Sequence, residues 1–251
     1  LLESDYSKIF ECAGENGPGS VFEVQYTDVE GASFECLQCS EGNVAVGFQG
    51  VRGYSGPDFT PGFSFNVPTQ DVVDEFEAGD LRKDVAILDI DAWAAATGAE
   101  FTTGYEHTGY FNRKYIPRTR SNDAAGDQNL TNPNNYRAIR YADVLLMAAE
   151  ANNRKSSPND ALARTYLNMV RERAFGNADN NVTTSGTNLT AAIYKERRVE
   201  LVGEGHHFFD LVRTGRGAQI PGFTENKNEV FPIPFEEIQF SQGNWEQNDR
   251  Y

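Results

Sequence analysis

The sequence predicts a mainly α-helical fold, in which TPR-like helical hairpins are joined to a loop-rich part that contains short strands. After Tyr136, apolar residues recur at helical spacing. Earlier in the chain, residues 21–26 (VFEVQY) alternate apolar and polar side chains, which is typical of a half-buried strand. Residues 47–65 are interrupted by glycine and proline and are rich in aromatic residues, which predicts loops.

We expect three regions along the chain. Residues 1–20 have the pattern of a helix end followed by a turn at 14–19, and we interpret them as the end of an N-terminal helical part. Residues 21–135 form the loop-rich region, with a short helix beginning at Thr69 or Gln70 and capped at Gly79. The turn-forming stretch DQNLTNPNNY precedes the helical region, which covers residues 136–251.

Four helices are predicted in the helical region. The apolar face of the first helix consists of Ile139, Ala142, Leu145, Leu146 and Ala149. Ser157 and Pro158 supply an N-cap and a first-turn proline for a second helix, which is lined by Leu162, Tyr166 and Met169. The third helix covers residues 189–203 and the fourth covers residues 207–214. One hairpin cannot bury its own apolar face, so we expect the first two helices to stack on others.

The composition excludes several classes of partner. The net charge of −15 at neutral pH repels phosphate backbones and anionic membrane surfaces, so a nucleic-acid partner is not expected. No run of 18 apolar residues is present that could span a bilayer. Neutral ligands and calcium remain compatible with this charge.

The cysteines favour a structural role. Cys36 and Cys39 form a single C-x-x-C, with Cys12 left over, so a four-cysteine zinc site cannot form. The pair leads into a glycine-rich stretch rather than a helix, which argues against a thioredoxin-like motif. A local disulfide and a pair of buried thiols both remain open.

The stretch 196–216 (ERRVELVGEGHHFFDLVRTGR) concentrates acidic residues, arginines and two histidines. Glu196, Glu200 and Glu204 recur every four residues and share one helix face, which forms no cleft for a pair of catalytic carboxylates. The adjacent His206 and His207 point about 100° apart on a helix and do not match the spacing of a zinc helix. We therefore interpret the charges, with Arg197 and Arg198 beside the acids and Asp210 one turn from Arg213, as pairs that hold a helical corner together.

Several of these stretches carry a resemblance to a known family. RAIRYADVLLMAAEA, ALARTYLNMVRERA, IYKERRVELVGEGHHFFDLVRTG and VFPIPFEEI resemble, in this order, the C-terminal region of SusD/RagB-family lipoproteins. FNVPTQDVVDEFEAGDLRKD and YFNRKYI are similar to the middle region of the same family. The likeness runs from about residue 21 to the end of the chain. It departs at His207, where the family usually has arginine, and at the final QNDRY, where it usually has Gln-Asn-Pro-Gly-Tyr.

The resemblance implies a SusD-like α/α fold and a non-enzymatic lipoprotein on the bacterial cell surface, held in the outer membrane. Such proteins capture glycans, or peptides in RagB-like members, and pass them to a SusC-like TonB-dependent transporter. The partners implied are therefore a glycan, that transporter and the N-terminal half of the same protein, which would carry the lipid anchor and the first helical repeats.

Candidate ligand residues lie in the loop-rich region, because sugar rings stack on flat aromatic faces and hydrogen-bond at their edges. The aromatic candidates are Trp93, Tyr105 and Tyr54, with Phe59 and Tyr110 behind them. Arg52, Asn112 and Arg113 are the polar candidates. Each single ring has an alternative role in the core, and the short run of small residues around Trp93 fits either a protruding ring or a ring tucked inward.

No catalytic residue and no cofactor is predicted. Asp89 and Asp91 could help to hold a structural calcium, although DIDAWA does not match the EF-hand loop. Two other functions compete with glycan capture. One is peptide capture, and the other is a secreted hydrolase, for which no pair of catalytic carboxylates can be located.

Overall fold

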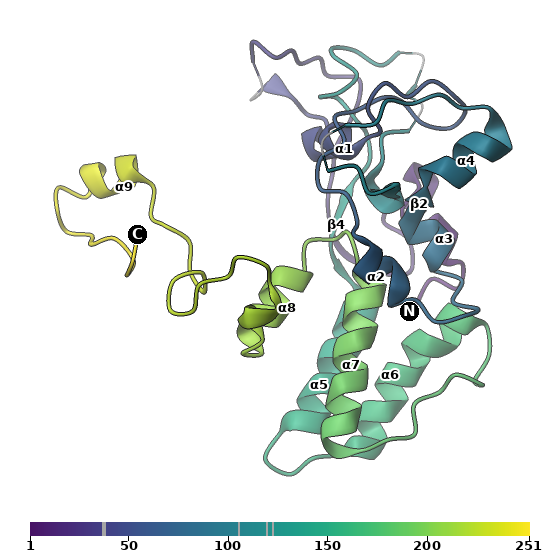
Figure 1. The fold of residues 1–251 in the computed structure, drawn as a ribbon, viewed down its shortest axis with the longest axis vertical. Helices are drawn as coiled ribbons and strands as arrows, with labels where there is room; N and C mark the ends of the chain where they lie inside the picture. The colour runs from purple at the N-terminus through teal and green to yellow at the C-terminus, as the bar shows by residue number, and fades with distance from the viewer. Residues whose placement is uncertain (37–38, 105, 119, 122) are drawn as a thin grey trace. The chain divides into compact units, whose positions relative to one another are not determined.

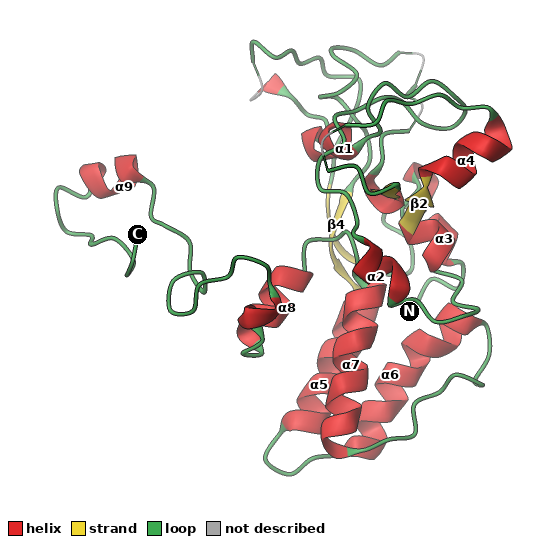
Figure 2. Ribbon diagram, viewed as in Figure 1, coloured by secondary structure: helices red, strands yellow, loops and turns green. Residues whose placement is uncertain are grey.

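The computed structural model describes residues 1–36, 39–104, 106–118, 120–121 and 123–251. The chain divides into two compact units, Leu1–Glu204 and Gly205–Tyr251. Helices dominate the regular structure, and the described strands form two small two-stranded sheets (Figure 2). The predicted mainly α-helical fold class is confirmed.

Three long helices lie side by side in the first unit (Figure 1): α5 (Tyr141–Arg154), α6 (Asp160–Phe175) and α7 (Gly186–Glu200). They share one buried apolar cluster, which consists of Ala142, Leu145, Leu146, Ala149, Ala163, Leu167, Val170, Leu189 and Ile193. The hairpin of α5 and α6 therefore stacks on a further helix as expected, and that helix is α7 of the same chain.

The start of α6 differs from the prediction. The N-cap is Asn159, whose side-chain oxygen accepts a hydrogen bond from the Leu162 amide at 3.1 Å, so the expected cap at Ser157 was wrong. A side chain at position 159 reaches the unpaired amides of the first turn, and one at position 157 is too far back. Met169, expected on the inner face, is 39% exposed, because the buried stripe runs through Ala163, Leu167 and Val170 instead.

Strand β1 (Ser20–Val24) pairs antiparallel with β4 (Tyr136–Arg140). The strand was predicted, but its apolar residues were expected on the buried side and they are exposed instead. Phe22 is 56% exposed and Glu23 is buried, because the Glu23 carboxylate accepts hydrogen bonds from the Asn16 amide and from the Asn135 side chain. Strand β4 was missed, since Ile139 was assigned to the first helix, which begins only at Tyr141.

The described residues of the loop-rich part include four short α-helices and the second sheet. The helices are α1 (Val44–Gln49), α2 (Gln70–Asp74), α3 (Lys83–Ala86) and α4 (Ile90–Thr97). The sheet pairs β2 (Ile87–Asp89) antiparallel with β3 (Tyr110–Asn112). Helix α2 begins where predicted but ends before the expected cap at Gly79. Cys36 and Cys39 form a disulfide, which selects one of the two structural alternatives, and Cys12 is a free thiol.

Residues 1–20 contain two short 3₁₀ helices, η1 (Tyr6–Lys8) and η2 (Cys12–Gly14), where the end of a helix was expected. Tyr6, Ile9 and Phe10 of this segment are buried. Tyr6 and Phe10 pack with Val46 and Tyr115 in one cluster, so this segment belongs to the core of the first unit.

The charged stretch 196–216 contributes three glutamates to a buried ion-pair network. Glu196, Glu200 and Glu204 expose at most 2% of their surface. Their cationic partners come from other segments, and they are Arg82 before α3, Lys114 in η4 (Arg113–Tyr115), Arg140 at the end of β4, and Arg171 and Arg173 in α6. The network joins the loop-rich part to the helical layer, so these acids have a structural role as predicted, but their partners lie outside the helical corner where they were expected.

Glu200 lies at the centre of the network. Its carboxylate pairs with Arg82 at 2.9 Å, with Arg140 at 2.8 Å and with Arg173 at 2.7 Å. Glu204 pairs with Arg140 at 2.7 Å and with Lys114 at 2.6 Å. The Glu200 backbone carbonyl also accepts hydrogen bonds from Arg140 and Lys114, so the end of α7 is satisfied by cations.

The arginines of α7 have other partners than expected. Arg197 pairs with Asp143 of α5 at 2.6 Å, and Arg198 pairs with Glu75 at 2.8 Å. Both point away from the glutamate row, since residues adjacent in sequence leave a helix in different directions. The expectation that they pair with the acids of their own helix was wrong.

The network shifts the pKa values of its members. Burial alone raises the pKa of Glu200, but Arg173, Arg140 and Arg82 outweigh it and hold that pKa far below its usual value. Glu204 follows the same pattern, with burial opposed by Arg140 and Lys114, and its pKa is also lowered. Burial lowers the pKa of Lys114 to about 8, although Glu204 acts in the other direction.

Acidification is expected to destabilise the fold through these carboxyls. Because the folded-state pKa values of Glu200 and Glu204 lie below the reference value of 4.5, their stabilisation is fully present above that pH and is lost as the pH falls below it. Each carboxyl contributes a slope of about 1.4 kcal/mol per pH unit in this range. Urea unfolding at neutral pH and at about pH 3 measures this loss of stability. An unfolding free energy that is the same at both pH values would contradict the expectation.

The second unit, Gly205–Tyr251, contains α8 (His207–Arg213), η5 (Gly217–Gln219) and α9 (Phe235–Phe240). Asp210 and Arg213 form the predicted pair at 2.7 Å. Large apolar side chains in this unit are exposed, namely Phe209, Val230, Phe231, Phe235, Phe240, Trp245 and Tyr251. In the described part of the chain, no helix combines the length and apolar character needed to cross a bilayer.

Candidate functional site

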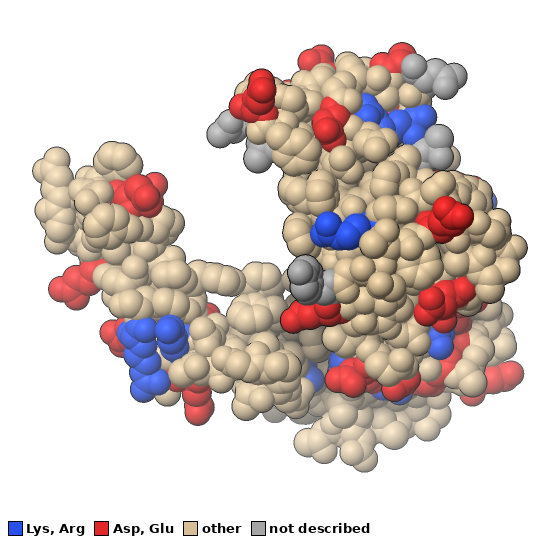
Figure 3. Space-filling model, turned by 45° about the horizontal axis from the view of Figure 1, so that its top comes forward, with Lys and Arg blue, Asp and Glu red and all other residues tan. Residues whose placement is uncertain are grey.

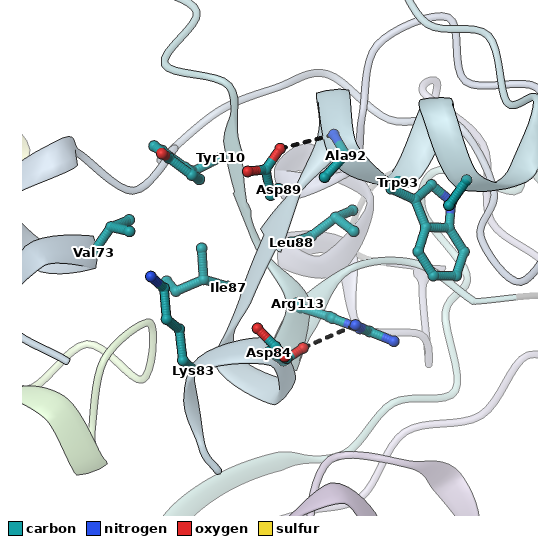
Figure 4. A pocket seen from close by; sticks show the side chains of 11 residues that line it. Val73, Lys83, Asp84, Ile87, Leu88, Asp89, Ala92, Trp93, Tyr110 and Arg113 are labelled. Carbon is teal, nitrogen blue, oxygen red and sulfur yellow. Dashed lines mark hydrogen bonds between the residues drawn. The ribbon is translucent and has the colours of Figure 1, made fainter. Parts of the chain in front are cut away.

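A hollow of about 430 Å³ lies in the first unit, around β2 and α4 (Figure 4). Residues of α2, α3, β2, α4, β3 and η4 line it, and they are Val73, Lys83, Asp84, Ile87, Leu88, Asp89, Ala92, Trp93, Ala96, Tyr110 and Arg113. Its lining combines one indole, one phenol and four charged groups, a composition suited to a small ligand that has both apolar faces and hydrogen-bonding edges.

Strand pairing brings the two halves of the hollow together. Asp89 lies opposite Tyr110 in the antiparallel register of β2 and β3, so residues about twenty apart in sequence become neighbours. Helix α4 follows β2 directly, and Asp89 caps it by accepting a hydrogen bond from the Ala92 amide at 2.9 Å. Arg113 follows β3 at once and points toward Trp93 of α4 (Figure 4).

Trp93 is half-buried and firmly held. Its indole N–H donates a hydrogen bond to the Tyr54 hydroxyl at 2.9 Å, and its ring packs against Phe59, with the ring centroids 5.3 Å apart. The Arg113 guanidinium carbon lies 5.4 Å from the Trp93 ring centroid, within the range of a cation–π contact. The ring is therefore fixed before any ligand arrives, which lowers the entropic cost of binding.

The Arg113 guanidinium has a second contact besides the Trp93 ring. One of its terminal nitrogens donates a hydrogen bond to the Asp84 backbone carbonyl at 2.8 Å. Burial lowers its pKa, with Arg118 acting in the same direction. An arginine nevertheless stays charged at neutral pH, and its five N–H donors suit the hydroxyl groups of a ligand.

The surface around the first unit suits a neutral ligand. On the face shown in Figure 3, most of the surface carries no charge and acidic side chains are more frequent than basic ones. This agrees with the net charge of −15. The electrostatic field of this negative charge repels polyanions and leaves uncharged molecules unaffected.

Some of the predicted site residues line the hollow, and others are buried behind it. Trp93, Tyr110 and Arg113 line the hollow together. Tyr54 and Phe59 are 5% and 7% exposed, and they support the Trp93 ring from below rather than face solvent.

The remaining predicted residues lie elsewhere. Asn112 is buried, and its amide donates hydrogen bonds to the Gln49 side chain and to the Gly203 carbonyl, so it holds the backbone in place. Arg52 is exposed and lines a second hollow. Tyr105 lies outside the described residues.

The expectation of a structural calcium gains no support from the geometry. The Asp89 carboxylate is engaged as the cap of α4. Among the residues whose positions are described, no group of three or more histidine, cysteine, aspartate or glutamate side chains is placed to hold a metal ion.

Lys83 and Asp84 line the hollow but were not predicted from the sequence. They come from α3, a single turn immediately before β2. Their charged residue types are common on any surface, and only the pairing of β2 with β3 places them opposite Arg113. No local sequence signal distinguishes them.

The sequence pattern of the SusD family matches residues 89–230, which is more than half of the chain and includes Trp93, Tyr110 and Arg113. The chain belongs to the SusD family. Members of this family are binding proteins rather than enzymes.

The fold of this chain is found, over its whole length, in relatives with known structures. The chain is similar to a laminarin-binding SusD-like protein, with 36% identity and a TM-score of 0.85 over 100% of this chain and 54% of that one. It is also similar to surface glycan-binding protein A from Bacteroides thetaiotaomicron in complex with laminarihexaose, with 28% identity and a TM-score of 0.83 over 99% of this chain and 56% of that one.

Curated relatives agree with this assignment. SusD-like protein P2 from Formosa agariphila is 29% identical over 209 residues, which covers 75% of this chain and 41% of the relative. SusD-like protein P38 from the same organism is 35% identical over 95 residues, or 34% of this chain and 18% of the relative. The chain therefore spans about half the length, or less, of the proteins it matches.

Proposed function

We propose that this chain is part of a cell-surface lipoprotein of the outer membrane that captures an oligosaccharide or polysaccharide. The observation that carries the proposal is the hollow around β2 and α4, which we call the Trp93 hollow. There the fixed Trp93 indole and the fixed Arg113 guanidinium lie next to each other in a chain of the SusD family. A sugar ring has an apolar C–H face that stacks on an aromatic ring, and hydroxyl edges that accept hydrogen bonds from arginine.

The ligand class that we propose is a glucan of the laminarin type. Two structural relatives, at 36% and 28% identity, are a laminarin-binding protein and a protein in complex with laminarihexaose. The lining supports a neutral sugar chain, because the cationic Arg113 and Lys83 are balanced by Asp84 and Asp89.

We further propose delivery of the captured glycan to a SusC-like TonB-dependent transporter. This part rests on family membership. Binding without catalysis fits such a role, because a carrier must release its ligand unchanged.

Calorimetric titration tests the ligand class. Laminarihexaose, maltohexaose, cellohexaose and a mixture of short peptides would each be added to the chain, and we expect saturable binding of laminarihexaose. Binding of the peptides alone would replace this proposal with peptide capture.

Prolonged incubation with laminarin is expected to release no new reducing ends. The glutamates with the greatest burial, Glu196, Glu200 and Glu204, are held by cations that lower the pKa of Glu200 and Glu204, which is unsuitable for a general acid at neutral pH. A reducing-end assay on repurified protein measures this. Product formation in proportion to protein concentration would contradict the proposal.

A further inference from the structure

Arg113 and Lys114 are neighbours in η4, but their side chains lie in different surroundings. The Arg113 guanidinium lies at the Trp93 hollow, where it contacts the Trp93 ring and the Asp84 carbonyl (Figure 4). The Lys114 side chain is fully buried and ends in the ion-pair network. One turn of three residues therefore carries a group of the candidate site and a group of the network.

Lys114 binds η4 to the end of α7. Its ammonium group donates one hydrogen bond to the Glu200 carbonyl at 2.8 Å and another to the Glu204 carboxylate at 2.6 Å. The same ammonium group lies 4.8 Å from the ring centroid of Phe10 and 5.5 Å from that of Tyr6. Two hydrogen bonds from a charged donor and two cation–π contacts leave this side chain little freedom to move.

Asn112, the residue before Arg113, is held by the same end of α7. Its amide nitrogen donates hydrogen bonds to the Gly203 carbonyl at 2.9 Å and to the Gln49 side chain at 2.7 Å. The approach to α7 is so close that a Cβ atom at position 203 would come within 2.5 Å of the Asn112 side chain. Glycine at this position permits the contact, and its φ of 75° also favours glycine.

Both neighbours of Arg113 are thus bound to residues 200–204. The peptide units on either side of Arg113 cannot shift without breaking buried hydrogen bonds, and a buried polar group that loses its partner is costly. A side chain on a short turn keeps one direction only if the backbone of the turn is held. The end of α7 supplies that support.

We propose that Asn112 and Lys114 are positioning residues for Arg113, and that they hold its guanidinium at the Trp93 ring through their bonds to the end of α7. The inference rests on the proposed glycan-binding function of the Trp93 hollow. Asn112 and Lys114 are buried and do not line the hollow, so their effect on a ligand passes through Arg113. Asn112, predicted as a ligand contact, thereby has an indirect role in binding.

Calorimetric titration with laminarihexaose tests the two positioning residues. Asn112→Ala and Lys114→Met are each expected to weaken binding about three- to tenfold, well below their melting temperatures, because the Arg113 guanidinium is no longer held in place. The matched control is Arg173→Met. Arg173 belongs to the same network, through its pair with Glu200 at 2.7 Å, but does not adjoin η4 in sequence. Its loss should lower the melting temperature and leave the affinity unchanged.

An Arg113→Ala background separates positioning from a general loss of stability. Arg113→Ala alone is expected to weaken laminarihexaose binding about tenfold. On this background Asn112→Ala and Lys114→Met should weaken binding no further, because residues that act through one group are not additive. The inference is refuted if Arg113→Ala leaves the affinity unchanged, or if the two substitutions weaken binding equally with and without Arg113.

The pH dependence of affinity gives a second readout for Lys114. Burial lowers its pKa to about 8, with Arg140 acting in the same direction and Glu204 and Glu200 acting against it. Of the groups that face it, the pKa values of Glu200 and Glu204 are lowered, and those of Arg140 and Tyr6 are raised well above their usual values. Among these groups, Lys114 is therefore the one that changes its charge near pH 8.

Laminarihexaose affinity is expected to fall about two- to threefold from neutral pH to about pH 9, as the Lys114 bonds to the end of α7 weaken. This titration does not itself lower stability. The folded-state pKa lies below the reference value of 10.5, so the unfolded chain binds more protons in this range and the contribution of Lys114 to stability rises with pH. An affinity that stays constant in the unsubstituted chain, or that falls equally in Lys114→Met, contradicts the role of Lys114.

The proposed function and the positioning role fail in different ways. If the unsubstituted chain binds laminarihexaose and Trp93→Ala weakens that binding, but Asn112→Ala and Lys114→Met keep the affinity of Arg173→Met, the proposed function stands and the positioning role is refuted. If the unsubstituted chain binds no glycan, the proposed function fails and the positioning role fails with it.

Discussion

Replacing Glu200 with alanine is expected to lower the free energy of unfolding by about 3–5 kcal/mol, because it leaves buried charges without their partner. Three arginines, Arg82, Arg140 and Arg173, converge on this carboxylate within 2.9 Å. The Glu200 side chain is fully buried, so water cannot replace it without rearrangement of the surrounding core. Urea unfolding measures the change.

The control for Glu200→Ala is Glu236→Ala. Glu236 lies on the surface in α9, and its loss is expected to change stability by less than about 0.5 kcal/mol. Glu200→Gln keeps the shape and removes only the charge, and it should also be strongly destabilised. Equal stability of Glu200→Ala and Glu236→Ala would show that the ion-pair network does not hold the two parts of the first unit together.

Replacing Trp93 with alanine is expected to weaken glycan binding about five- to thirtyfold, the effect of losing a stacking ring. Because the ring is half-buried against Phe59, we also expect a stability loss of about 1–2 kcal/mol, less than the ~3–5 kcal/mol for a fully buried ring. The Tyr54 hydroxyl retains its own hydrogen bond to the Pro57 carbonyl, which limits this loss.

Trp245→Ala is the matched control for Trp93→Ala. Trp245 is 53% exposed in the second unit, and its removal should leave glycan affinity unchanged. If Trp93→Ala melts far below the unsubstituted chain and the folded fraction binds with normal affinity, Trp93 is a core residue only.

The sequence predicted the helical layer because each helix there repeats its apolar residues over three or more turns. The start of α6 could not be placed, since Ser157 and Asn159 are both good caps and the choice depends on how the α5–α6 connection closes. Strand β4 was missed because its five residues run directly into α5, so Ile139 fits the helical period by coincidence.

The candidate site was predicted only in part. Trp93, Tyr110 and Arg113 were found from residue type and region, and the structure brings them together. Whether a ring in a loop faces solvent depends on contacts made far along the chain, so the burial of Tyr54 and Phe59 could not be predicted from local sequence.

Fluorescence of single tryptophans tests the central claim, that Trp93 lies at the glycan-binding surface. The chain has two tryptophans, Trp93 and Trp245, so Trp245→Phe leaves Trp93 as the only indole and Trp93→Phe leaves Trp245. Titration with laminarihexaose should change the emission of the Trp245→Phe protein saturably, at the affinity measured by calorimetry, and leave the emission of the Trp93→Phe protein unchanged. Calorimetric binding with no change in Trp93 emission would contradict the account.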